Sequence, residues 1–207
     1  MDRTSKLFDA WANTGRSEEM EKGHGTTVNQ FLDKLPLREN FRFLDIGCGN
    51  GWVVRKMSQK SSCIKAIGID KSKMMIKNAK SKTSSKKESY FVTELESWST
   101  KEKFDVIFSM ESLYYSVPME PGLEKVFKLL KKNGIFYCGT DFYSNNTLTT
   151  RWLKDMNIPM DLRSEKEWKT MFRKIGFSTR SKHVTDPKNK SKWKREFGTL
   201  FIAGRKP

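Results

Sequence analysis

Short apolar runs and longer amphipathic stretches alternate through the middle of the chain. The apolar runs predict buried strands, at 41–46, 63–69, 89–93, 104–109 and 135–143. The amphipathic stretches carry apolar residues at helical spacing and predict helices, at about 51–59, 72–82 and 122–132. Strands that alternate with helices need crossover connections, so the pattern predicts an α/β fold with a mostly parallel sheet.

The two ends of the chain depart from this alternation. At the start we expect two helices, at about 4–12 and 25–35, joined by a polar loop. At the end, a helix near 164–175 precedes two strand-like runs, 177–184 and 197–203, with a polar loop between them. Two strands joined without a helix pair antiparallel, so we expect an antiparallel hairpin at one edge of the sheet.

The composition fits one soluble globular domain. The 207 residues are 36% hydrophobic, and no run approaches the roughly 18 apolar residues of a membrane span. No apolar signal core follows the N-terminus, and Cys48, Cys63 and Cys138 form no pair at metal-ligand spacing. With only two histidines, the chain is expected to hold no metal, and its scattered thiols indicate a cytoplasmic location.

The net charge of +16 raises the question of an anionic partner. Lysines cluster at 71–87, 125–132 and 182–195, where a basic surface can attract RNA or anionic metabolites. Alternatively, these lysines occupy ordinary solvent-facing positions, and no arginine–aromatic pattern typical of RNA binding is present. We therefore favour a small-molecule partner, anionic ones included, over nucleic acid. The oligomeric state is left open.

A glycine-rich turn follows the first strand of the alternating region. Asp45 ends this strand, and Gly47, Gly49 and Gly51 open the next helix, where backbone N–H groups can bind an anion such as a carboxylate. A dinucleotide site favours a small residue where this chain has Trp52, and a carboxylate such as Asp45 suits a pyrophosphate poorly. The turn fits a ligand that carries an ammonium or sulfonium group together with a carboxylate, as S-adenosylmethionine does.

The next strand ends extend this site, because ligands of open α/β sheets bind at the carboxyl ends of strands. Asp70 ends the second strand and can accept hydrogen bonds from a ribose diol. The turn after the third strand, Thr93 to Leu95 with Glu94 between them, is expected to hold adenine. Lys71 and Met74 are expected to line the same pocket.

These motifs resemble the class I S-adenosylmethionine-dependent methyltransferases, in particular the small-molecule branch of the ubiquinone/menaquinone-biosynthesis type. The resemblance runs from about Phe41 to Tyr143 and is strongest over 44–51. It implies a Rossmann-like three-layer sandwich with a seven-stranded, mostly parallel sheet and a C-terminal antiparallel hairpin. Together with the strand-end reasoning, it gives the expected cofactor contacts: Asp45, Gly47, Cys48, Gly49, Asp70, Lys71, Met74, Thr93, Glu94, Leu95, Ser109 and Trp11.

The fourth strand ends in Ser109-Met110-Glu111, and this end faces the methyl acceptor in the resemblance. The Asp/Asn-Pro-Pro-aromatic run of enzymes that methylate exocyclic base nitrogens is absent, as is a cysteine placed for 5-methylcytosine chemistry. Transfer from a sulfonium depends mainly on positioning, so few groups are needed. The candidates for positioning the acceptor or removing its proton are Glu111, Tyr115 and His24, with Tyr114 and Asp141 as further candidates.

We expect one methyltransferase domain over 1–207, with a helical lid at 1–40, a cofactor-binding core at 41–143, an acceptor-side insertion at 144–163, and the last helix and hairpin at 164–207. The predicted reaction is methyl transfer to a small molecule. Two alternatives stay open: an RNA or protein methyltransferase that uses the basic surface, and a non-catalytic S-adenosylmethionine-binding protein.

Overall fold

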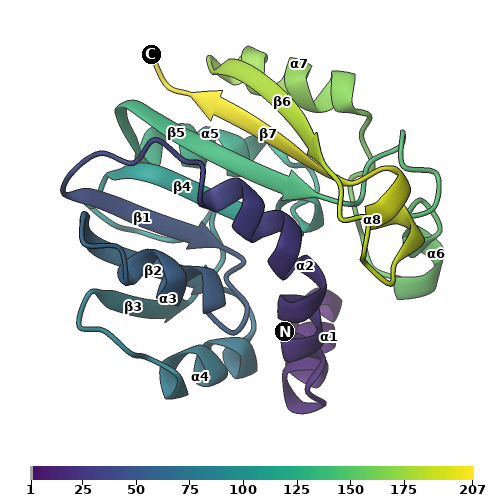
Figure 1. Cartoon of the computed structure of the whole chain (residues 1–207), viewed down its shortest axis with the longest axis horizontal. Helices are drawn as coiled ribbons and strands as arrows, with labels where there is room; N and C mark the ends of the chain where they lie inside the picture. Colours follow the sequence, from purple (N-terminus) through teal and green to yellow (C-terminus); the bar gives the residue numbers. More distant parts are fainter. Residues whose placement is uncertain (1) are drawn as a thin grey trace.

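A seven-stranded sheet forms the centre of the molecule in a computed structural model, which describes residues 2–207 (Figure 1). Its strands lie in the order β3-β2-β1-β4-β5-β7-β6. Only β7 runs against its neighbours, pairing antiparallel with β5 and β6, while the other pairs are parallel. The strand bounds are β1 Phe41–Ile46, β2 Cys63–Asp70, β3 Glu88–Val92, β4 Phe104–Met110, β5 Leu130–Thr140, β6 Ser178–Val184 and β7 Thr199–Arg205. This confirms the predicted fold class.

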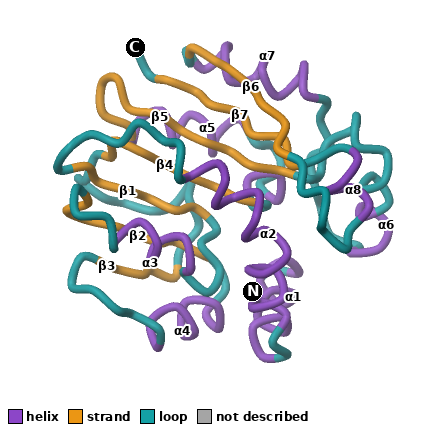
Figure 2. Tube along the Cα trace, viewed as in Figure 1, coloured by secondary structure: helices purple, strands orange, loops and turns teal. Residues whose placement is uncertain are grey.

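Helices cover both faces of the sheet, so the fold has three layers (Figure 2). Helices α2, α3 and α4 pack on one face and α5 and α7 on the other, each through buried apolar side chains. The helix bounds are α1 Arg3–Asn13, α2 Arg16–Leu32, α3 Trp52–Ser58, α4 Lys73–Ser81, a 3₁₀ turn η1 Leu113–Tyr115, α5 Glu120–Leu129, α6 Trp152–Met156, α7 Glu165–Ile175 and α8 Lys192–Glu196. In residues 2–207, no helix has the length and apolar character of a membrane span.

The second N-terminal helix corrects the sequence-based prediction. A polar loop was expected up to about residue 24, but α2 begins at Arg16, directly after Gly15 with φ +77°. Glycine inside a helix costs up to about 1 kcal/mol, so Gly23 and Gly25 disfavoured this assignment. Buried Val28 and Leu32 hold the helix against the sheet, and this packing outweighs the propensity.

Two further boundaries differ from the prediction. Helix α5 ends at Leu129 rather than near 132, because Leu130 is already extended and begins β5. Asn133, just after the predicted end of the helix, lies within β5 at φ +64°. The polar loop between β6 and β7 contains the short helix α8.

Candidate active site

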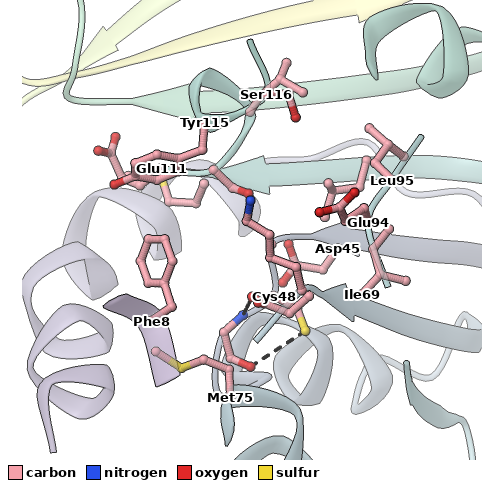
Figure 3. Close-up of a pocket in the computed structure, with 18 of the residues that line it drawn as sticks. Phe8, Asp45, Cys48, Ile69, Met75, Glu94, Leu95, Glu111, Tyr115 and Ser116 are labelled. Atoms are coloured by element: carbon pink, nitrogen blue, oxygen red, sulfur yellow. Dashed lines mark hydrogen bonds between the residues drawn. The ribbon is translucent and has the colours of Figure 1, made fainter. Parts of the chain in front are cut away.

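A cavity of about 500 Å³ lies at the carboxyl ends of the parallel strands. Its walls come from the ends of β1, β2, β3 and β4 and from helices α1 and α2. Figure 3 shows two groups of side chains: Asp45, Ile69, Glu94 and Leu95 on one side, and Glu111, Tyr115 and Phe8 on the other. Pockets of this size bind cofactors and small molecules.

The glycine turn forms the base of the first group, but its amides are mostly used within the protein. The N–H groups of Gly47 and Cys48 donate to the Ile69 carbonyl, at 2.9 and 3.0 Å. Those of Gly49, Gly51 and Trp52 donate to Asp70, to the Cys48 carbonyl and to Asn50 Oδ1. The expectation that the turn offers a row of free N–H groups to an anion is therefore wrong for these five amides. The end of β2 accepts from three of them, and the turn itself accepts from Gly51 and Trp52.

Asp45 is the carboxylate at the end of β1 and is only 3% exposed. Burial, and then the charge of Asp70, raise the pKa of Asp45 well above its usual value. No side chain in residues 2–207 forms an ion pair with it. A buried carboxyl group without a counter-ion is stabilised by an incoming cation, so this position fits the positive groups of S-adenosylmethionine.

Asp70, at the end of β2, connects the glycine turn to helix α4. Its Oδ2 accepts from the Gly49 N–H at 2.9 Å and its Oδ1 from the Ser72 N–H at 2.8 Å. Burial raises the pKa of Asp70, and these two hydrogen bonds act in the opposite direction. The carboxylate is thus fixed at the cavity wall, with further lone pairs available for hydroxyl donors.

Most predicted site residues line this cavity, and five do not: Met74, Ser109, Trp11, Tyr114 and Asp141. Met74 lies outside the lining and Met75 is within it, because the Ser72 N-cap orients α4 so that Met75 is buried. Ser109 is fully buried between β1 and β5. Trp11 packs against Phe8 of the same helix and against Arg16 of α2. The lining does include Asp45, Gly47, Cys48, Gly49, Asp70, Lys71, Thr93, Glu94, Leu95, Glu111, Tyr115 and His24.

Glu111 lies at the end of β4 with φ +51°, a conformation that a non-glycine residue rarely adopts. Its Oε1 accepts from the Asp141 N–H, and its Oε2 accepts from the Tyr114 hydroxyl at 2.8 Å. Burial, and then the Asp141 charge, raise the pKa of Glu111 to about 8. Such strain and such a pKa are typical of functional positions.

Aromatic rings surround the Glu111 end of the cavity. Phe8 of α1 packs edge-to-face on Tyr115, with ring centroids 5.2 Å apart. Tyr114 lies 4.4 Å from Tyr115 by the same measure. The predicted insertion, 144–163, contributes no residue to the lining. Its contact with the lining residue Tyr115 is a hydrogen bond of 3.8 Å that the Tyr115 hydroxyl donates to Met156 Sδ.

A buried polar cluster lies behind Glu111, and one of its members, Lys194, was not predicted from the sequence, whereas His24 and Asp141 were among the candidates. Lys194 of α8 forms an ion pair of 2.6 Å with Asp141, which follows β5, and both side chains are almost fully buried. Lys194 Nζ also lies 3.0 Å from Nδ1 of His24, on α2. Burial, and then Lys194, lower the pKa of His24 to about 4, so His24 is neutral at pH 7. Lys194 lies in a lysine-rich polar segment, where no sequence signal separates it from its neighbours.

The metal prediction rested on the spacing of the three cysteines and on the presence of only two histidines. Throughout residues 2–207, no group of three or more His, Cys, Asp or Glu side chains has the geometry to hold a metal ion.

Residues 37–198 match the family model described as a methyltransferase domain. Among curated proteins, a ubiquinone biosynthesis O-methyltransferase of Pelagibacter ubique is 38% identical over 107 residues, which are 51% of this chain and 43% of that protein. A malonyl-[acyl-carrier protein] O-methyltransferase of Priestia megaterium is 24% identical over 69% of this chain and 49% of its own length. The chain spans about half the length of these curated relatives.

Solved structures show the same architecture. A methyltransferase crystallised with the Trm112 methyltransferase activator of Haloferax volcanii has a TM-score of 0.91, 27% identity and 97% coverage of both chains. Magnesium protoporphyrin IX methyltransferase of Synechocystis, with bound S-adenosylmethionine, has a TM-score of 0.71 and 14% identity over 100% of this chain and 98% of its own. Together with the matched family model and the strand-end carboxylates, this shows that the chain belongs to the class I S-adenosylmethionine-dependent methyltransferases.

Proposed function

We propose that this protein transfers a methyl group from S-adenosylmethionine to a small-molecule acceptor. The observation that carries the proposal is that one cavity contains both the strand-end carboxylates Asp45 and Asp70 and the polar–aromatic group of Glu111 and Tyr115. The cofactor would be held by Asp45, Asp70 and the turn from Thr93 to Leu95. It supplies an electrophilic methyl group on a positively charged sulfur.

The remaining lining residues would position the acceptor. Glu111 and Tyr115 present oxygens at the end of β4, and Phe8, Met20 and His24 come from the N-terminal helices. Holding two reactants in attack geometry can supply about 7–11 kcal/mol of the barrier. Closing the cavity also removes water from the reacting groups.

Residues 1–40 would act as a lid within a single domain. The Asp9 carboxylate accepts from the Ser72 hydroxyl at 2.6 Å and from the Met74 N–H at 3.1 Å. Glu21 accepts from the Asn50 side chain at 2.8 Å. These contacts join α1 to the start of α4 and α2 to the glycine turn, so the cavity opens only when they break.

The direct test is to incubate the pure protein with methyl-labelled S-adenosylmethionine and a cell extract divided into metabolite, lipid, RNA and protein fractions. Label in the metabolite fraction is expected. Label in RNA or protein instead would favour the alternative acceptors, and no label in any fraction despite cofactor binding would favour a non-catalytic role.

An activator protein, like the one bound to the Haloferax volcanii relative, is proposed as a partner. The edge strand β3 supports this, because Phe91 and Val92 on it and Ile64 on β2 are each more than 40% exposed. Exposed apolar residues on an unpaired strand edge favour addition of a partner strand. Mixing the chain with a purified activator of that family should give one complex on size exclusion, and Phe91→Lys should abolish it.

A further inference from the structure

The cavity is acidic although the protein is strongly basic. Its lining includes seven carboxylate side chains, Asp2, Glu21, Asp45, Asp70, Glu94, Glu96 and Glu111. Lys71 is the one lysine in the lining, and it is paired with Asp2 at 2.9 Å. Although the chain has a net charge of +16, this cavity is lined mainly by acidic groups. It is therefore unfavourable for an anionic acceptor and favourable for a cationic one.

The carboxylates of the donor half face a cofactor that carries positive groups of its own. Glu111 is different, because it lies on the other side of the cavity, next to Tyr115 and Phe8 (Figure 3). Both of its polar contacts are neutral donors, the Asp141 N–H and the Tyr114 hydroxyl. The neighbouring cation, Lys194, is paired with Asp141, and the effect of Asp141 on the pKa of Glu111 is larger than that of Lys194.

The walls around Glu111 are suited to an alkylammonium group. Phe8 and Tyr115 approach edge-to-face from the lid and from η1, and Met20 and Met110 also line the cavity. Aromatic faces attract cations, and Met side chains pack against hydrocarbon of varied shape. His24 is neutral at pH 7, with Lys194 close to Nδ1, so it adds no positive charge here.

We propose that the methyl acceptor is a primary or secondary amine, which binds as its ammonium ion beside the Phe8–Tyr115 pair with Glu111 as counter-ion and proton acceptor. This inference rests on the proposed function and names the substrate class of the same site.

The chemistry balances without a further reactant. The ammonium ion, R–NH3⁺, transfers one proton to the Glu111 carboxylate and becomes a neutral amine with a free electron pair. The electron pair of the amine nitrogen forms a bond to the methyl carbon while the carbon–sulfur bond breaks. The electron pair of the broken carbon–sulfur bond stays on sulfur, which gives S-adenosylhomocysteine. The product is the methylated ammonium ion, and Glu111 releases its proton to solvent.

The surroundings of Glu111 favour this assignment over an oxygen acceptor. An alkylammonium group has a pKa of about 10.4, as for lysine, which an ordinary carboxylate is poorly matched to deprotonate. The raised pKa of Glu111, about 8, reduces that mismatch. A phenol or alcohol that gave its proton to Glu111 would become an anion among the other acidic side chains of the lining, and a carboxylate acceptor would be repelled from the start.

The first experiment identifies the methylated atom. The pure protein is incubated with methyl-labelled S-adenosylmethionine and the metabolite fraction of a cell extract, and the labelled product is examined by cation exchange and mass spectrometry. A labelled N-methyl amine is expected. A labelled ether, ester or C-methyl product would overturn the amine assignment and leave the proposed function standing, whereas label in no metabolite would count against both.

The second experiment measures binding without turnover. With S-adenosylhomocysteine saturating, phenethylamine is titrated by calorimetry against phenethyl alcohol as the uncharged probe of the same shape. We expect the amine to bind more tightly by about tenfold or more, since a buried charge pair is made only by the amine. Near pH 7 its binding should also release close to one proton, seen as a heat that varies with the buffer, because the ammonium ion ionises Glu111.

Glu111→Gln should remove both the preference for the amine and the proton release, and it should leave the affinity for S-adenosylhomocysteine unchanged. That unchanged affinity would show that the variant is folded. The matched control is Glu124→Gln, the same change at an exposed position on α5, which should behave as the wild type. Equal binding of amine and alcohol by the wild type, absence of measurable amine binding, or an unchanged preference in Glu111→Gln would overturn the proposal.

Discussion

The Lys194 ammonium and the Asp141 carboxylate lie 2.6 Å apart in the interior, although 53 positions separate the two residues in the sequence. The Thr199 hydroxyl donates to the other carboxylate oxygen at 2.6 Å. Burial alone raises the pKa of Asp141, but Lys194 and His24 outweigh it, and the net shift is downward. The pair connects α8 to the end of β5, directly behind Glu111.

Lys194→Met should therefore destabilise the protein by about 3–5 kcal/mol, because it leaves a buried charge without its partner. Urea unfolding measures this. Adding Asp141→Asn should recover part of the loss. The control is Lys192→Met on the same helix, whose exposed pair with Glu196 contributes about 0–1 kcal/mol. A loss no larger than that of the control would show that the buried pair is not important for stability.

His24 should make the protein sensitive to acid. Its pKa is about 4 in the folded state and 6.5 as the unperturbed value, so the unfolded chain takes up a proton first as the pH falls. The stability that depends on neutral His24 is present above pH 6.5 and is lost between pH 6.5 and about 4. Unfolding free energies of wild type and His24→Gln, compared over this range, should converge as the pH falls. The contribution of Glu111 to stability changes with pH in the opposite direction, because its pKa is raised. Since Glu111 is present in both proteins, its contribution cancels in the comparison. If the unfolding free energies of the two proteins instead changed in parallel with pH, the lowered pKa of His24 would be contradicted.

Asp45→Asn should separate stability from cofactor binding. Removing a buried carboxyl group that lacks a counter-ion should raise the thermal unfolding temperature of the empty protein. The same change should weaken S-adenosylmethionine by about tenfold or more, measured by calorimetry, because the cation loses its partner. Asp155→Asn, at an exposed position of α6, should change neither quantity. Unaltered cofactor affinity in Asp45→Asn would remove Asp45 from the site.

Gly47→Ala should be poorly tolerated. The residue has φ +68°, and a Cβ atom there would lie 1.9 Å from Ser112 Oγ. The left-handed conformation alone costs about 1–2 kcal/mol for other residues, and the clash adds to it. Adding Ser112→Gly should recover the part due to the clash. By contrast, Gly23→Ala meets no atom within 4 Å and should stabilise α2 by about 0.4–1 kcal/mol. Chemical denaturation of these variants beside the wild type measures the differences.

The sequence predicted which strand-end side chains meet at the cavity, because one topological rule places them. Once the strands were assigned, Asp45, Asp70 and Glu94 had to meet at one edge of a parallel sheet. The error of one residue between Met74 and Met75 arose from the phase of α4, which depends on where its N-cap Ser72 lies. The free amides expected in the glycine turn could not be judged from the sequence, since three of the five amides donate to the end of the next strand.

The remainder of the site depends on tertiary packing that no local pattern records. Helix α2 extends through two glycines because Val28 and Leu32 reach the sheet. Lys194 is one lysine among several in its segment, and only the fold brings it to Asp141. The segment 144–163 was expected as an acceptor-side insertion, and the structure instead packs Trp152 and Met160 against the core.

The Asp9 carboxylate completes the first turn of a helix that belongs to a different part of the chain, accepting from Ser72 and Met74 at the start of α4. Lifting α1 thus leaves that turn without its outside acceptor, two residues from Asp70. We expect departure of the proposed lid and loosening of the proposed ribose-binding edge to be a single event. The spent cofactor and the methylated product are expected to leave on the timescale of this event, which hydrogen exchange at the amides of 72–75 would report.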